Sequence, residues 1–325
     1  MTRSTLKALC AGLATWLFVG AAGAQADYPS KPIRIVLPIA AGSVTDVVLR
    51  AAAQELAPRL GQQLIIDNKP GASGVIGADT CAKAPPDGYT VCAVYHATMS
   101  FNPLTIEKLP YDPQKDFVPI ARLFFVTEAL VVPASLPVAN VAELRQHAEK
   151  HPKVLNFGTL GEGSLQELMV AWLNQEWKTD IAPIPYKGGG PIATAVAAGE
   201  IQIAQMGVGN FLGPMQAGQV KALAVSADRR SRLLPNVPTA AEAGLGGFAS
   251  RPWWGLAAPV GTPAAVVAKL NSEFARLFRE PKFVEFLESR YIEPAPTTPQ
   301  EFAAFLKSDR ESAANLVKIA QGSKR

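Results

Sequence analysis

The chain has 325 residues, of which 48% are hydrophobic and 18% are charged, and its formal net charge at pH 7 is +4. The apolar fraction is large enough to build sizeable hydrophobic cores. The small net charge, with no long block of like charges, gives no case for nucleic-acid binding.

Residues 1–26 are typical of a signal peptide. Arg3 and Lys7 form a charged n-region, an apolar stretch follows over residues 8–22, and small residues at 22–26 supply a cleavage site. The apolar stretch is shorter than a membrane span requires, and no later segment is long and apolar enough to cross a bilayer. We therefore expect an exported protein with a formal net charge of +2 after cleavage. Roughly three hundred residues remain, which suits two domains.

The mature chain begins with a predicted strand, a short loop and a helix. Ile33–Leu37 is apolar, residues 40–43 are small, and a helix is expected to start near Thr45 with Asp46 in its first turn. Free backbone N–H groups and the helix dipole point at one place in such a unit. The pattern therefore indicates an anion site.

The same alternation continues. A strand is expected at Leu64–Ile66, a helix at Val75–Ala84 and a strand at Tyr89–Tyr95, which indicates a parallel sheet with helices on both faces. Cys81 falls on that helix and Cys92 on that strand. Export permits a disulfide between them, but two buried thiols fit the sequence equally well.

The remainder of the chain repeats the pattern and ends in helices. We predict extended segments at Phe124–Val126 and Ala129–Val132, a helix from Asn140 to Lys150, a strand at Val154–Gly158, a helix at Ser164–Trp177, a strand at Ile184–Tyr186, a helix at Ile192–Ala198, strands at Ile201–Met206, Ala222–Val225 and Arg251–Ala258, and helices at Pro263–Arg279, at Lys282–Arg290 and from Thr298.

Two sheets in succession followed by helices imply a discontinuous first domain. Lobe 1 is expected to comprise residues 27–124 and 247–325, and lobe 2 residues 125–246. The two crossings near Phe124 and Arg251 would form a hinge, and a ligand would bind in the cleft between the lobes.

Three loops share a strand, a run of small residues and a helix start: residues 40–46, 159–164 and 186–191. Glycine allows close approach of the backbone to a ligand, and each following helix offers unsatisfied N–H donors. Two or more such loops facing one cleft would converge on a carboxylate.

Each single residue in these loops also has a purely structural interpretation. Asp46 can stabilise its helix N-terminus, Ser164 can be only an N-cap, and Lys187 can be a solvated loop charge. His147 and His151 have the spacing of a metal pair, but they fall at a helix C-terminus, which favours cationic side chains, so we expect no metal site.

Enzyme signatures are absent from the sequence. It contains no G-x-S-x-G, H-E-x-x-H or G-x-x-x-x-G-K-[ST] motif, and a Ser-His-Asp arrangement would have to use His96. We expect a protein that is not an enzyme and needs no cofactor.

Several segments resemble the Bug family, the periplasmic solute receptors of tripartite tricarboxylate transporters. They include YPSKPIRIVLPIAAGSVTD, LGQQLIIDNKPGASGVIGA, KAPPDGYTV, KLPYDPQKDFVPIA, PIPYKGGGP, AGQVKALAVSADRRSRLLPNVPTAAEAG and GLAAPVGTPAAVVAKLN, and they cover nearly all of the mature chain in family order. The resemblance implies a type II periplasmic-binding-protein fold with two α/β lobes. It also implies a periplasmic monomer that binds an organic carboxylate through main-chain groups and water, with integral-membrane transporter subunits as partners.

The loops depart from the family pattern in places. The first usually reads P-F-x-P-G-G-x-x-D; this chain keeps Pro38, Gly42 and Asp46 but loses a proline and a glycine. Glu167 stands where the second loop usually has His, and Met206 replaces a strand-end Asp.

Apolar residues near these loops suggest an apolar ligand body. Leu160, Met206, Val208 and Phe211 would make the cleft less polar, which favours a dicarboxylate with a methylene chain or an aromatic carboxylate; alternatively, they are packing residues behind the site. The candidate ligand-binding residues are Ala40, Gly42, Ser43, Asp46, Thr98, Gly161, Gly163, Ser164, Tyr186, Lys187, Gly188, Met206 and Asn210. The alternatives to a carboxylate receptor are an exported sensor with a membrane signalling partner and an exported hydrolase.

Overall fold

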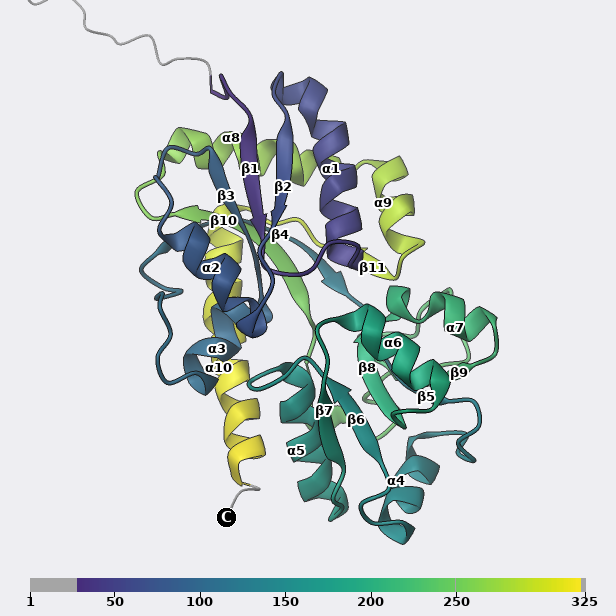
Figure 1. The fold of residues 1–325 in the computed structure, drawn as a ribbon. Helices are drawn as coiled ribbons and strands as arrows, with labels where there is room; N and C mark the ends of the chain where they lie inside the picture. Colours follow the sequence, from purple (N-terminus) through teal and green to yellow (C-terminus); the bar gives the residue numbers. More distant parts are fainter. Residues whose placement is uncertain (1–27, 249, 323–325) are drawn as a thin grey trace, which may run out of the picture.

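The computed structural model describes residues 28–248 and 250–322, so the expected signal peptide lies outside the described residues. It contains a six-stranded and a five-stranded sheet, each packed against helices (Figure 1). We call the first sheet with its helices lobe 1 and the second lobe 2. The two-lobed α/β fold expected from the sequence is confirmed.

The sheet of lobe 1 is mixed. Its strands are β1 (Ile33–Leu37), β2 (Leu64–Asn68), β3 (Thr90–Tyr95), β4 (Phe117–Val126), β10 (Trp253–Pro259) and β11 (Ile292–Pro294), in the spatial order β11-β4-β10-β3-β1-β2. β1 is parallel to β2 and β3, whereas β10 is antiparallel to β3 and β4. The parallel arrangement expected for the first three strands is confirmed. The complete sheet is mixed because β10 returns from lobe 2 and not through a strand-helix-strand crossover. The short edge strand β11 was not predicted.

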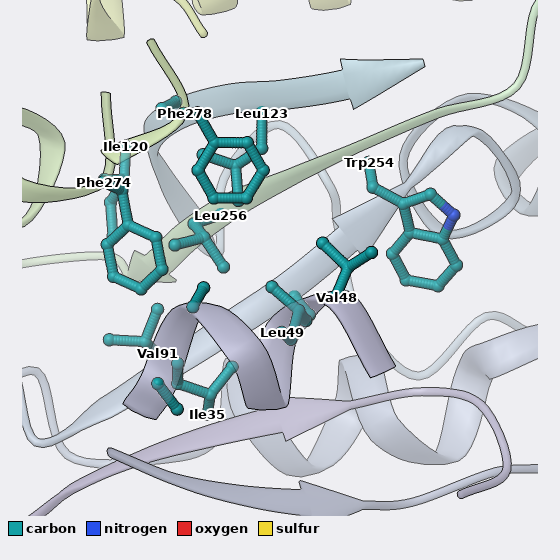
Figure 2. Close-up of a cluster of buried hydrophobic side chains, with 14 of the residues drawn as sticks. Ile35, Val48, Leu49, Val91, Ile120, Leu123, Trp254, Leu256, Phe274 and Phe278 are labelled. Carbon is teal, nitrogen blue, oxygen red and sulfur yellow. The ribbon is translucent and has the colours of Figure 1, made fainter. Parts of the chain in front are cut away.

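Helices bury apolar side chains on both faces of this sheet. α1 (Val44–Leu60), α8 (Ala264–Leu277) and α9 (Pro281–Glu288) share one core with it, and α2 (Val75–Ala82) and the start of α10 (Pro299–Gly322) share the other. Figure 2 shows the first core, where Leu49 of α1 and Phe274 of α8 lie near Leu256 of β10. This packing fixes α1, and with it the loop that precedes it.

The sheet of lobe 2 is also mixed. Its strands are β5 (Glu128–Pro133), β6 (Asn156–Thr159), β7 (Ala182–Pro185), β8 (Ile203–Gly207) and β9 (Val220–Val225), in the order β7-β6-β8-β5-β9. Its helices are α4 (Val141–Lys150), α5 (Leu165–Trp177), α6 (Gly189–Ala198) and α7 (Leu212–Gln216). β6 is parallel to β7 and β8, whereas β5 is antiparallel to β8 and β9. The carboxyl end of β8 and the start of β5 therefore lie at the same edge.

The remaining elements are short. They are α3 (Asn102–Thr105), 3-10 turns at Ala72–Gly74, Val208–Asn210 and Gly246–Phe248, and a π-helical turn at Ala97–Phe101. The π-helical turn and α3 extend from lobe 1 toward lobe 2, because Phe101 belongs to the core around α5.

The two chain crossings between the lobes lie side by side. The first is at Thr127, between β4 and β5, and the backbone N–H of Val126 donates to the carbonyl of Pro252 on the returning segment at 2.8 Å. Arg251 on that segment pairs with Asp228 of lobe 2 and with Glu293 of β11.

The C-terminal helix α10 contacts both lobes. Phe302 and Leu306, near its start, lie in a core of lobe 1, whereas Leu316 and Val317 lie with α5 in a core of lobe 2. The two ends of this helix thus pack in the cores of different lobes.

Cys81 and Cys92 form a disulfide between α2 and β3. Of the two alternatives left open by the sequence, the structure has the bridge. Both residues are buried in lobe 1, within the core shared by α2 and α10.

Candidate functional site

The first of the three loops is held by Asp46 at the start of α1. Ser43 is the N-cap, and its hydroxyl accepts a bond from the N–H of Asp46 at 3.2 Å. The Asp46 carboxylate accepts from the N–H of Gly42 at 2.9 Å, from Arg50 Nε at 3.0 and 3.1 Å and from Asn68 Nδ2 at 3.0 Å. Asp46 is only 3% exposed, so its carboxylate is paired with donors inside the protein and is largely shielded from solvent.

The pKa of Asp46 reflects these bonds. Burial acts to raise it, but hydrogen bonds from Arg50, the Gly42 backbone and Asn68 outweigh burial and lower the pKa below its usual value. Asp46 is therefore ionised at neutral pH and fixes the shape of the loop at Gly42, where φ is +80°.

The second loop has the same construction at the start of α5. Ser164 is the N-cap, and its hydroxyl accepts from the N–H of Glu167 at 3.4 Å. Gly161 and Gly163 have φ values of +93° and +77°, a region that glycine adopts without strain. The Thr159 hydroxyl accepts from the N–H of Gly161 at 3.2 Å, which closes the loop.

The third loop, residues 186–190, packs beside Asn210. A Cβ placed on Gly189 would lie 2.8 Å from Asn210 Oδ1, so this glycine permits close contact between the two segments. Asn210 Nδ2 in turn donates to the carbonyl of Gly207 at 3.0 Å. Tyr186 is partly buried, Lys187 is exposed, and space beside Gly188 is open.

Loops from the two lobes meet at three points between the sheets. Ser73 Oγ donates to the carbonyl of Glu162 at 3.1 Å. A Cβ on Gly209 would lie 2.7 Å from Val44 Cγ2, and a Cβ on Gly163 would lie 2.9 Å from Thr105 Oγ1. The starts of α1 and α5 therefore belong to one region, the lobe junction.

Free N–H donors lie in the first turns of these two helices. Four backbone N–H groups have no acceptor among the described residues, those of Val44, Thr45, Leu165 and Gln166. Helix dipoles add partial positive charge at the same points. The junction can therefore bind an anion without a cationic side chain.

Some residues chosen from the sequence have other roles. Thr98 is fully buried, and its hydroxyl accepts from the N–H of Tyr95 and donates to the carbonyl of the same residue, which closes the turn after β3. Val208 and Phe211 are fully buried in the core beneath α6, so packing behind the site is the correct interpretation for both. Leu160 and Met206 are only partly buried.

Other residues near the loops were missed by sequence reasoning. Asn68 follows β2 and reaches Asp46 across 22 positions, and Arg50 completes this network by bonding both. Ser73 lies in a turn, and its backbone carbonyl accepts hydrogen bonds from the Tyr95 hydroxyl and from Asn102 Nδ2. Of these contacts, only the one between Arg50 and Asp46 could have been predicted from the sequence, because the two residues are four positions apart on the predicted helix.

The described residues contain no group of three or more metal-ligating side chains. His147 lies in the last turn of α4 and His151 is its C-cap residue, and their ring centroids are 4.6 Å apart. Among the described residues, no helix has the length and hydrophobicity to span a bilayer.

Residues 48–321 match the model of the tripartite tricarboxylate transporter family receptor. The chain belongs to this receptor family. The resemblance inferred from the sequence is thereby confirmed. A UPF0065 protein of Bordetella bronchiseptica is 35% identical to this receptor over 308 residues, which cover 94% of this chain and 90% of the relative.

Solved structures of similar proteins support the same family. A Rhodopseudomonas palustris protein solved with adipate superposes with a TM-score of 0.86 at 31% identity, covering 90% of this receptor and 98% of that chain. MatC from the same species, solved with bound malate, gives a TM-score of 0.81 at 32% identity and covers 89% and 100% of the two chains.

Proposed function

We propose that this protein is a periplasmic receptor that captures an organic carboxylate at the lobe junction and delivers it to membrane-embedded transporter subunits. One observation carries the proposal: two serine-capped helix N-termini, one from each lobe, lie at the junction and have free N–H groups. Such an arrangement suits a carboxylate, whose two oxygens can accept from both helices at once. The adipate and malate in two related structures support the same ligand class.

The candidate binding groups are mainly backbone. Gly42 and Ser43 from lobe 1 and Gly161, Gly163 and Ser164 from lobe 2 shape the loops, while the first turns of α1 and α5 supply donors. Ala40, Tyr186, Lys187, Gly188, Met206 and Asn210 are proposed to surround the rest of the ligand. Asp46 orients its loop.

The proposal treats the protein as a receptor and not as an enzyme. Two of the three histidines lie at the end of α4, and Nδ1 of His96 is enclosed without a hydrogen-bond partner. Nothing in this arrangement resembles a base oriented toward a nucleophile.

A thermal-shift screen tests the function. A ligand that binds only the folded state raises the melting temperature, so at least one mono- or dicarboxylate, with adipate and malate in the panel, should stabilise the protein in a concentration-dependent way. The matching amides serve as controls, because they lack the charge. Recovery of the ligand unchanged is expected; turnover, or stabilisation by amides and carboxylates alike, contradicts the proposal.

A further inference from the structure

Glu128 places a buried carboxyl group at the lobe junction. It is the first residue of β5, directly after the crossing at Thr127, and it pairs in register with Gly207 at the carboxyl end of β8. The edge of the lobe 2 sheet that carries Glu128 is thus the edge that faces lobe 1. Glu128 is only 6% exposed.

One carboxylate oxygen of Glu128 accepts a hydrogen bond, and the other accepts none from the described residues. Oε2 accepts from Gln205 Nε2 at 3.0 Å. Oε1 has no donor among the described residues. The enclosed polar atoms that lack a partner within the described residues belong to other side chains, namely Asp79, His96, Asn102 and Trp253. Oε1 is therefore not completely enclosed, and it is free to accept a hydrogen bond.

Gln166 connects this carboxyl group to the start of α5. It lies two residues after the N-cap Ser164 and is 4% exposed. Its Nε2 donates to the carbonyl of Gln205 at 3.2 Å and to Met206 Sδ at 3.4 Å. A single chain of contacts thus runs from the α5 N-terminus through β8 to Glu128.

This arrangement is costly for stability. Burial raises the pKa of Glu128 to about 7, and only the Gln205 bond acts to lower it. The neighbours that bond Glu128 are the uncharged Gln205 and Ser226. An apolar residue would fill the same place without this cost, so the carboxyl group is a candidate for a functional role.

We propose that Glu128 is a specificity-determining residue whose Oε1 accepts a hydrogen bond from the ligand. This inference rests on the proposed function and deepens it. The preferred ligands are then carboxylates that carry a donor, a hydroxyl or an ammonium group, close to the carboxylate held at the helix N-termini. The burial of Val208 and Phe211, which removes two expected apolar contacts, agrees with a more polar ligand.

Calorimetric titration with matched ligands tests this. Succinate, malate and aspartate differ only in a hydrogen, a hydroxyl or an ammonium group at one carbon, and glutarate, 2-hydroxyglutarate and glutamate form a second such set. The parent should bind a donor-bearing member about tenfold to a hundredfold more tightly than the unsubstituted one. Glu128→Gln is nearly isosteric: its amide oxygen keeps the Gln205 bond, so its NH2 group replaces Oε1. This variant should bring the ratio of affinities close to one.

Two controls keep the outcome clear. Glu176→Gln removes an exposed carboxylate at the far end of α5 and should leave the ratio unchanged. Circular dichroism checks that each variant is folded, and Glu128→Asp, which restores a carboxylate, should recover part of the preference. Absence of donor preference in the parent, or full preference in Glu128→Gln, overturns this inference while the proposed function stands. Absence of binding by every carboxylate overturns both.

Discussion

Asp46 places a negative charge where an anion is proposed to bind, and its hydrogen bonds explain how the two can coexist. Arg50, Asn68 and the Gly42 backbone take up both carboxylate oxygens. The loop is thereby shaped before a ligand arrives, which reduces the entropy cost of binding.

Replacing Asp46 with Asn tests this role. The folded-state pKa of Asp46 is lowered, so its contribution to stability is present above the unfolded-state pKa and is lost as the pH falls through the folded-state pKa. We expect Asp46→Asn to lower the free energy of unfolding by about 1–3 kcal/mol at pH 7, with the difference narrowing below about pH 4. Carboxylate binding should weaken as well. Denaturant titrations of both proteins at several pH values measure the first effect; a difference independent of pH contradicts it.

The glycines of the second loop offer a matched pair. Gly161 and Gly163 both have positive φ, but a Cβ on Gly161 meets no atom within 4 Å, whereas one on Gly163 meets Thr105 at 2.9 Å. Gly161→Ala should cost about 1–2 kcal/mol of stability from backbone strain alone. Gly163→Ala should cost more and should also weaken ligand binding, because it disturbs the contact with lobe 1. Equal effects of the two substitutions on both measurements would argue against a role for this contact.

Individual side chains were predicted unevenly from the sequence. Ser164 was identifiable as an N-cap because capping depends on residues three positions apart, whereas the same role of Ser43 was not predicted. The partners of Asp46 and Glu128 were not identifiable, since Asn68 and Gln205 lie 22 and 77 positions away. Asn68 reaches Asp46 because α1 packs on the sheet that contains β2, and Gln205 reaches Glu128 because β8 pairs with β5.

Among the elements, the disulfide between α2 and β3 stabilises lobe 1 away from the junction. Replacing both Cys81 and Cys92 with alanine should lower the free energy of unfolding by about 2–3 kcal/mol, because the bridge restricts the unfolded chain. Ligand affinity should stay within twofold of the parent value, about 0.4 kcal/mol. Scanning calorimetry of the double variant measures the stability, calorimetric titration measures the affinity, and mass spectrometry of the unreduced parent checks that the bridge is present. Lost binding in a folded double variant would show that the bridge supports the site.

The helix α10 links the two lobes through its ends. Leu316→Ala removes a buried side chain from the core shared with α5, and it should lower stability by about 2–4 kcal/mol. Lys318→Ala, on an exposed position of the same helix, is the control and should change stability by less than about 0.5 kcal/mol. Thermal unfolding of both variants measures the difference, and equal melting temperatures would contradict this packing.

Element order and the parallel direction of β1, β2 and β3 were predictable from sequence, whereas the direction of β10 was not. Val44–Leu60 and Leu165–Trp177 form helices as predicted because each has an N-cap and buries an apolar face. The direction of Trp253–Pro259 depends on where the chain re-enters lobe 1 after crossing, and no local pattern encodes that.

At the scale of the whole molecule, the crossings at Thr127 and Pro252 lie side by side, and we propose that they act as a hinge between the lobes. We expect a saturating carboxylate to decrease the radius of gyration measured by solution scattering, since a ligand bonded to both lobes favours their closest approach. The matching amide is the control and should leave the radius unchanged. Identical scattering profiles with and without a bound carboxylate would contradict closure.

The central claim is that a carboxylate is held between the lobes by backbone donors of α1 and α5. The most direct test is a crystal structure with the tightest-binding carboxylate from the thermal-shift screen. We expect its carboxylate oxygens to lie within about 3.2 Å of amide nitrogens in the first turns of both helices. A carboxylate bound away from these turns, or held by the side chain of Lys187 alone, would contradict the account.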